Sequence, residues 1–545
     1  MKKNLIGLIL ISIFLNSAIF GQNVQQIYKD KNAPIEKRVN NLLSLMTLEE
    51  KILMLGGTGF TTQPIERLGI PSLNMADGPL GVRWDNSTAF PSGIAMSSTW
   101  DPELIYKVGN AIGEETKAHG RNVILGPCVN IARIPQGGRN FESFGEDPFL
   151  TSKMGVAYIK GVQNNNVVAT VKHFACNNQE LERMFVDTKV DERTLNEIYL
   201  PAFKAAVKEA DVMAVMSAYN KLNGHYASES DYLLVNKLKK EWNFKGFVMS
   251  DWGAVHSSEA TYNSGLDVEM PTGVYLNDKS FVKKLLANEY DLKKLDDKIS
   301  RMLTVMFKIG LFDNYQYDKS KLNTEEHKKL AYEVAADGMV LLKNSHSILP
   351  IDKEAIGSIA IIGPNAAYTR TGGGGSSLVS PFYTVSPLEG ITNKFGNQIE
   401  INYAPGLLLD GDAPVIEPKY FYLDKDGSKS GINVKYFNNK TISGNPILER
   451  VESSINNFWS NGSPVDGIGN ENFSVVYEGY IKFPKSGSTI VNVTSDDGSR
   501  LYIEDELVID DWNDHGMETK SFAFEVEKDK LYKIKLEYYE NMGDA

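Results

Sequence analysis

The chain has 545 residues, of which 42% are hydrophobic and 23% are charged, and its formal net charge is −12. This length exceeds the size at which a single hydrophobic core stops growing, so we expect several domains. The acidic balance argues against nucleic acid or an anionic membrane as the main partner.

The sequence contains only two cysteines, Cys128 and Cys176, and no zinc-type spacing of Cys and His. Two cysteines exclude a disulfide scaffold. We expect both to pack as small apolar side chains, with a single bridge as the alternative. We predict no metal ion and no organic cofactor.

The N-terminus has the order of a secretory signal. Lys2 and Lys3 precede an apolar run from Leu5 to about Leu15, and small residues lead from there to Gly21. We therefore predict a signal peptide at residues 1–21 and no membrane attachment after its cleavage. An uncleaved anchor is the alternative, for which the run is short. The expected location is the periplasm or the outside of the cell.

Residues 28–315 alternate short apolar runs with amphipathic stretches. Apolar runs without alternation suit strands that are buried on both faces of a parallel sheet. The stretch 101–120 starts with Asp101 as N-cap and Pro102, and it closes with Gly120, which predicts a helix. The predicted fold is α/β, a (β/α)8 TIM-type barrel. Its active site would lie at the carboxyl ends of the strands.

The rest of the chain changes character twice. After a predicted linker at 316–345, residues 346–410 hold one convincing strand, SIAIIGPNA, and the run TGGGGSS at 371–377, which we expect to be flexible and ligand-facing. No Gly-Lys-Ser/Thr follows and no G-x-G-x-x-G opens a helix, so phosphate binding has little support. We predict the incomplete start of an α/β sandwich domain there. Period-two alternation with turn clusters predicts an all-β sandwich at 411–545.

Polar side chains follow most of the apolar runs, and the carboxylate of Asp251 in GFVMSDWGAVH is the most informative. A carboxylate at a strand end is desolvated on one side and needs cations nearby, which Arg139, Lys172 and His173 offer. From spacing alone, a structural helix cap is equally favoured. The adjacent Trp252 favours a sugar site, because sugar rings combine apolar faces with polar edges.

Each of these residues also has a structural interpretation. Arg139 would pair with Glu142 or Glu146, Lys172 would be a solvated strand end, and His173 would be a satisfied core histidine. Spacing does not decide between these readings and the sugar site.

Six segments resemble, in this order, the barrel motifs of glycoside hydrolase family 3: ADGPLGVR, GRNFESFGEDPFL, KHFACNNQELER, MSAYN, GFVMSDWGAVH and GLDVEMP. LLKNSHSILP, IAIIGPNA and VSPLEG resemble the start of that family's second domain. SDDGSRLYIEDELVIDDWNDHG resembles the PA-14 β-sandwich that some members carry inserted there. Asp496 and Asp497 in it resemble paired acids that bind calcium in some sugar-binding relatives, but a tight turn is the reading we favour.

The resemblance implies a retaining exo-β-glycosidase with Asp251 as nucleophile. The residues that would hold the sugar hydroxyls are Asp77, Arg139, Lys172, His173 and Arg183, and those that would line the ring are Met216, Tyr219 and Trp252. The implied activity is a β-glucosidase that removes terminal non-reducing β-D-glucosyl residues from β-linked oligosaccharides. A β-xylosidase of the same family and a non-catalytic carbohydrate-binding or adhesion protein are the alternatives. Oligomeric state stays open.

A retaining mechanism also needs a second carboxyl that acts as acid and base. The resemblance implies a Glu that follows the inserted sandwich, whereas the 545 residues end at Ala545, directly after a strand-like run. We therefore expect a chain that is cut short, that lacks this Glu and that hydrolyses aryl glucosides poorly or not at all. A natural terminus is the alternative.

Overall fold

The computed structural model describes residues 26–545 except 84, 407–414, 460–461 and 544–545, so the predicted signal peptide lies outside the described residues. The chain divides into two compact units. The first consists of Met1–His346 and Arg370–Thr384, and the second of Ser347–Thr369 and Val385–Ala545. Within the part that the structure describes, no helix is long and apolar enough to cross a membrane.

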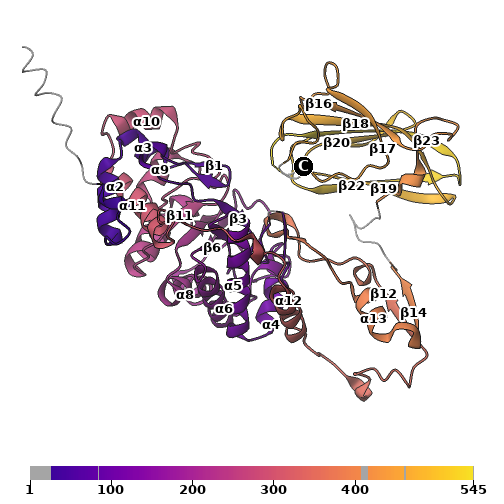
Figure 1. The fold of residues 1–545 in the computed structure, drawn as a ribbon, viewed down its shortest axis with the longest axis horizontal. Coiled ribbons are helices and arrows are strands. Elements are labelled where there is room, and N and C mark those ends of the chain that lie inside the picture. The colour runs from indigo at the N-terminus through magenta and orange to yellow at the C-terminus, as the bar shows by residue number, and fades with distance from the viewer. Residues whose placement is uncertain (1–25, 84, 407–414, 460–461, 544–545) are drawn as a thin grey trace, which may run out of the picture. The chain divides into compact units, whose positions relative to one another are not determined.

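A five-stranded parallel sheet forms the centre of the first unit (Figure 1), in the order β11-β8-β6-β5-β3. Its strands are β3 (Met75–Asp77), β5 (Val123–Leu125), β6 (Val168–Phe174), β8 (Ala214–Ser217) and β11 (Phe247–Ser250). Every residue of these strands is buried, as expected for runs that do not alternate. Each face of the sheet is therefore covered by other elements.

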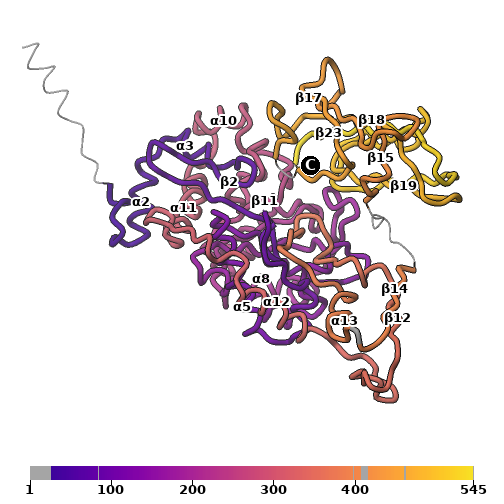
Figure 2. The backbone as a smooth tube through the Cα atoms, turned by 45° about the vertical axis from the view of Figure 1, so that its right-hand side comes forward, coloured from indigo at the N-terminus to yellow at the C-terminus, as the bar shows by residue number. Residues whose placement is uncertain are grey.

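Neighbouring residues on the strands enter two different cores. Ala76, Val215 and Val248 belong to one apolar cluster, which includes α5 (Pro102–Ala118), α6 (Pro148–Gln163) and α8 (Pro201–Ala210). Met75, Met216 and Met249 belong to the other, which includes α2 (Ile35–Leu45) and α11 (Leu292–Lys308). Successive side chains of a strand point to opposite faces, so the sheet separates these cores. Figure 2 labels α2, α5, α8, α11 and β11 on the backbone tube in a second view.

The sheet departs from eight equal repeats at its edges. A two-stranded hairpin of β1 (Gly57–Thr58) and β2 (Thr61–Thr62) lies beyond the five strands. Isolated bridges link it to the sheet: Met249 with Val268 and Gly56 with Glu269 in parallel, and Thr61 with Asn74 in antiparallel orientation. The bridges therefore connect β11, by way of Val268, Glu269 and the hairpin, to Asn74, the residue before β3. Among the described residues we find five regular parallel strands in this sheet, and the eightfold barrel stays a prediction.

Helix starts follow the signals in the sequence. Asp101 accepts hydrogen bonds from the first-turn N–H groups of α5, and Asp147 does so for α6. A proline occupies the first position of both helices, where no N–H donor is needed. The remaining α-helices described in the first unit are α3 (Leu48–Leu53), α4 (Gly93–Ser98), α7 (Glu192–Thr194), α9 (Ser258–Asn263), α10 (Lys279–Leu286) and α12 (Glu325–Asp337). Two of the described segments are π-helical, η4 (Leu195–Tyr199) and η6 (Asp231–Glu241).

Two segments outside the predicted barrel range pack with the first unit. The range 316–345, which we expected to be a linker, contains α12, whose His327 is bonded to Glu115 of α5. The segment Arg370–Thr384, called the strap below, carries β13 (Ser380–Pro381), which pairs in parallel with β4 (Asn86–Ser87). Part of the predicted α/β sandwich range therefore belongs to the first unit.

The second unit has little helix. β12 (Ser358–Ile362) and β14 (Glu400–Ala404) pair in parallel, and α13 (Pro387–Phe395) lies between them in sequence. The later part is all β and has its own apolar core, as its alternation predicts. Its strands are β15 (Phe421–Tyr422), β16 (Ile432–Phe437), β17 (Leu448–Glu452), β18 (Phe473–Lys482), β19 (Gly487–Ser495), β20 (Ser499–Ile503), β21 (Glu506–Asp511), β22 (Glu518–Val526) and β23 (Leu531–Glu540).

Candidate active site

The carboxyl ends of three strands carry the site, and these are every second strand of the sheet. Asp77 ends β3, Lys172 and His173 lie near the end of β6, and Asp251 directly follows β11. All four residues are at most 7% exposed. Parallel strands present their carboxyl ends at one edge of a sheet, so residues far apart in sequence gather there.

The two oxygens of the Asp251 carboxylate differ in their hydrogen bonding. Oδ1 accepts a hydrogen bond of 2.8 Å from the backbone N–H of Trp252. Oδ2 is buried without a hydrogen-bond partner among the described residues, and it lies 3.6 Å from Nε2 of His173. The next helix, α9, is preceded by Ser257 as its N-cap residue, so the helix-cap reading of Asp251 is wrong.

Asn130 fixes the orientation of His173. The amide oxygen of Asn130 lies 2.9 Å from both Nδ1 and the backbone N of His173, and its amide nitrogen donates to the His173 carbonyl at 2.9 Å. An amide oxygen only accepts, so Nδ1 donates and Nε2 presents a lone pair. Burial, followed by the charges of Arg139 and Lys172, lowers the pKa of His173 well below its usual value. The imidazole is therefore neutral at neutral pH.

Arg139 has three side-chain partners. Nη1 donates to Nε2 of His173 at 3.1 Å and Nη2 donates to Oγ of Ser376 at 3.1 Å, while Nη2 also pairs with the Glu142 carboxylate. Burial alone would lower the Arg139 pKa, but the carboxylate of Glu142 outweighs it and the pKa is raised. The expected pairing with Glu142 is thus present together with a contact to His173.

Two further charges lie in the same buried cluster. Lys172 is 1% exposed, so its reading as a solvated strand end is wrong. Glu142 is also 1% exposed, and burial raises the pKa of its carboxyl, while the charges of Arg139 and Lys172 act in the opposite direction. The cluster therefore combines the two cations Arg139 and Lys172 with a carboxylate that interacts with both charges.

Of the remaining predicted residues, Asp77 contacts Arg83, and Arg183 contacts Tyr219. Asp77 accepts a hydrogen bond of 3.2 Å from Arg83. Arg183 donates to Glu180 at 2.5 Å, and its guanidinium lies over the Tyr219 ring at 4.5 Å. Burial, followed by the Asp251 carboxylate, raises the pKa of Tyr219 well above its usual value. The phenol therefore stays protonated.

Two predicted ring-lining residues differ in exposure. Met216 is 2% exposed and belongs to the core shared with α2 and α11. Trp252 is half-buried, and its ring lies 4.9 Å from that of Phe60, between centroids. Of these two, Trp252 retains more accessible surface for a ligand.

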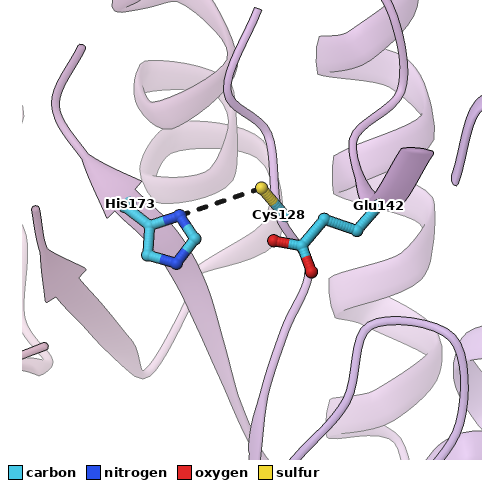
Figure 3. Close-up of side chains that lie close together, drawn as sticks. All are labelled: Cys128, Glu142 and His173. Atoms are coloured by element: carbon cyan, nitrogen blue, oxygen red, sulfur yellow. Dashed lines mark hydrogen bonds between the residues drawn. The ribbon is translucent and has the colours of Figure 1, made fainter. Parts of the chain in front are cut away.

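A small pocket with a cavity volume of about 10 Å³ adjoins the cluster. Cys128, Asn130, Arg139, Glu142 and His173 are among its lining residues. Figure 3 shows Cys128, Glu142 and His173 turned toward one another. That space suits one water molecule.

Among the residues that the structure describes, three groups of side chains bring possible metal-ligand atoms within 4.8 Å of one another: Cys128, Glu142 and His173; Asp511, His515 and Glu518; and Asp496, Asp497 and Glu540. In the first group, burial raises the pKa of the Cys128 thiol to about 12, so the thiol is protonated at neutral pH. The cations Arg139 and Lys172 also oppose a metal ion there. Cys128 and Cys176 are both free and buried.

Three residues that matter to this geometry were absent from the predicted site. Asn130 was not among the predicted residues, and Glu142 was considered only as an ion-pair partner of Arg139. Ser376 belongs to the glycine run, which we expected to face a ligand without knowing where. Nothing in the local spacing connects Ser376 with Arg139, because 237 positions separate them.

Comparisons with known proteins point in one direction. Residues 47–305 match the model of the glycosyl hydrolase family 3 N-terminal domain, and residues 428–545 match that of the PA14 domain. The chain is 39% identical over 485 residues to a β-glucosidase of Rhizobium radiobacter, with 87% of this chain and 58% of the relative covered. It is 39% identical over 489 residues to the thermostable β-glucosidase B of Acetivibrio thermocellus, with 84% and 64% covered.

The structure is also similar to the crystal structure of a Kluyveromyces marxianus β-glucosidase in complex with glucose. The TM-score is 0.77 at 32% identity, with 92% of this chain and 63% of that chain covered. The chain therefore spans about 58% to 64% of the length of these relatives.

Proposed function

The chain belongs to glycosyl hydrolase family 3 and carries a PA14 domain, and from this premise we propose that it acts as a retaining exo-β-glycosidase. The proposed reaction is that of a β-glucosidase, which removes terminal non-reducing β-D-glucosyl residues from oligosaccharides. The names of the relatives support this choice of sugar. We also propose that the first unit is the family's barrel and that the protein acts in the periplasm or outside the cell.

In the proposed mechanism, Oδ2 of Asp251 attacks the anomeric carbon while the bond to the leaving oxygen breaks, and the leaving oxygen takes up a proton. A glycosyl ester of Asp251 forms. Water then attacks the same carbon from the side that the leaving group vacated, loses a proton, and frees the carboxylate with net retention of configuration.

The observation that carries this proposal is the state of the Asp251 carboxylate. Oδ1 accepts a hydrogen bond from the Trp252 N–H, whereas Oδ2 is buried close to His173 and has no hydrogen-bond partner in the described part of the chain. The charge of Arg139 interacts with Asp251, so a cation lies close to the proposed nucleophile. Because His173 is neutral, it does not pair with the nucleophile as a cation. Asp251 thus keeps an oxygen for attack.

The other polar side chains of the proposed site suit a single sugar ring. Asp77, Arg139, Lys172, His173 and Arg183 offer acceptors and donors for hydroxyls. Trp252 and Tyr219 offer apolar surface for the ring face. This combination supports an exo-acting site.

The test uses a deoxyfluoro-β-glucosyl fluoride, whose ring fluorine slows release of the glycosyl ester and whose leaving group needs no general acid. We expect wild-type protein to gain one deoxyfluoroglucosyl group, located by peptide mass spectrometry on Asp251. Asp251→Asn should gain none, because an amide is a poor nucleophile.

Asp278→Asn is the matched control, since Asp278 only caps α10 at the surface. It should be labelled at the wild-type rate. Labelling at another residue, or at an unchanged rate in Asp251→Asn, would contradict the nucleophile assignment. Binding of glucose without any labelling of the wild type would favour the non-catalytic carbohydrate-binding alternative.

A further inference from the structure

The glycine-rich run at residues 371–377 has no part in the proposed mechanism, although its sequence suggested a ligand-facing loop. In the structure it belongs to the strap, which packs as part of the first unit. The strap is anchored by the pairing of β13 with β4 and by Val379, which is 3% exposed in the core. It is therefore held on the unit that carries the strand ends of the site.

The glycines let the strap lie directly against the segment that contains Arg139. A Cβ atom at Gly373 would lie 2.4 Å from a ring carbon of Phe141, which belongs to η3 (Asn140–Glu142). Gly374 and Gly375 have φ angles of 79° and 62°, in the left-handed region that favours glycine. Close approach and backbone conformation thus account for these glycines without a phosphate ligand.

The strap adds one polar contact to the site. The half-buried Ser376 accepts a hydrogen bond of 3.1 Å from Nη2 of Arg139. Nη1 of the same guanidinium donates to His173, and Nη2 also forms an ion pair with Glu142. These three partners come from the strap, β6 and η3. Because a guanidinium is planar with donors in a fixed fork, acceptors on different sides fix its plane.

We propose that Ser376 is a positioning residue: its hydroxyl completes the set of acceptors that holds Arg139 in the orientation needed to bind a sugar hydroxyl beside Asp251. The strap is then part of the glycoside-binding site. This inference rests on the proposed function.

A double-mutant cycle of Ser376→Ala and Arg139→Lys tests the proposal, because lysine keeps the charge and lacks the fork. In the wild-type background, Ser376→Ala should slow labelling of Asp251 by roughly tenfold, the size expected for one hydrogen bond to a charged group. In the Arg139→Lys background it should slow labelling less than about twofold. Ser376→Thr keeps a hydroxyl and should restore most of the rate.

Ser380→Ala, on the same strap, is the control and should label at the wild-type rate. Equal effects of Ser376→Ala in both backgrounds, or failure of Ser376→Thr to restore the rate, would overturn the proposal. The same four proteins can be compared by thermal unfolding, which measures the energy of the Ser376–Arg139 contact independently of labelling. If the two mutations are coupled in thermal unfolding but the wild type is not labelled, the proposed function is wrong and the Ser376–Arg139 contact stands. If the wild type is labelled but the two mutations are coupled in neither measurement, this inference is wrong and the proposed function stands.

Discussion

At the scale of single residues, the site depends on a neutral histidine whose proton position is set by an amide. His173 donates two hydrogen bonds to the amide oxygen of Asn130 and accepts one from its amide nitrogen at the backbone carbonyl. Its Nε2 lone pair accepts a hydrogen bond from Arg139. Because its pKa in the folded state lies below the ordinary value of 6.5, only the unfolded chain binds a proton just below pH 6.5. The contribution of His173 to stability is therefore complete above pH 6.5 and is lost as the pH falls.

Asn130→Ala should reduce both stability and labelling. It leaves the buried Nδ1–H and backbone N–H of His173 without an acceptor, which we expect to lower the free energy of unfolding by about 1–3 kcal/mol. The imidazole is then free to turn away from Arg139, so labelling of Asp251 should slow by roughly tenfold or more. Thermal unfolding and the labelling rate are the measurements. Asn196→Ala, on an exposed helix surface, should change neither, and a wild-type labelling rate in Asn130→Ala would contradict this role.

At the scale of elements, α12 is attached to α5 by a charged contact. Nδ1 of His327 lies 2.9 Å from Glu115 and Nε2 lies 3.2 Å from Glu114. Burial alone would lower the His327 pKa, but the two carboxylates outweigh it and the pKa is raised. Burial alone would raise the Glu115 pKa, but His327 and Thr88 outweigh it and the pKa is lowered.

These directions predict a pH window for the attachment of α12. The His327 contribution is complete below its ordinary pKa of 6.5 and is lost as the pH rises through the raised value in the folded state. The Glu115 contribution is complete above 4.5 and is lost as the pH falls through the lowered value. The contact should therefore stabilise most between about pH 4.5 and 6.5.

His327→Gln should lower the free energy of unfolding of the first unit by about 2 kcal/mol near pH 6, because it removes the charge between two carboxylates. The difference from wild type should shrink at pH 9. Unfolding followed by circular dichroism at both pH values measures it, with the exposed His225→Gln as control. A difference that does not depend on pH would show that His327 contributes only by packing.

At the scale of the whole molecule, two units with separate apolar cores predict two unfolding transitions. The β-rich unit carries a group that acts against its own stability. Glu540 is fully buried with Asp496 and Asp497 nearby, and burial, followed by the charge of Asp497, raises its pKa to about 8. In the unfolded chain the ordinary value is 4.5. Stability of this unit is therefore lost as the pH rises from 4.5 toward 8.

Glu540→Gln should raise the temperature of one transition and leave the other unchanged. The amide resembles the protonated acid, so the gain should be small near pH 5 and reach about 1–3 kcal/mol near pH 8. Scanning calorimetry at both pH values measures it. The exposed Glu525→Gln serves as control, and a decrease at pH 8 would mean that the charged carboxylate has a partner that stabilises it.

Some of this could be read from local sequence and some could not. Period and β-branched content predicted buried parallel strands and a separate all-β segment, and the pair Asp101–Pro102 predicted the start of α5. The helix within 316–345 and the attachment of the strap to the first unit were missed. Their positions depend on His327 and Val379 contacting residues far away in sequence, which local patterns do not report.

The sequence by itself determined which residues end the buried strands, because burial and chain direction follow from the order of apolar and polar residues. Asp77, His173 and Asp251 were identified in that way. Only the tertiary structure decided which atoms meet. Asn130 bonds to His173 across 43 positions and Ser376 to Arg139 across 237. Packing of distant segments brings such polar atoms within hydrogen-bond distance, and the spacing of residues in the sequence does not predict these contacts.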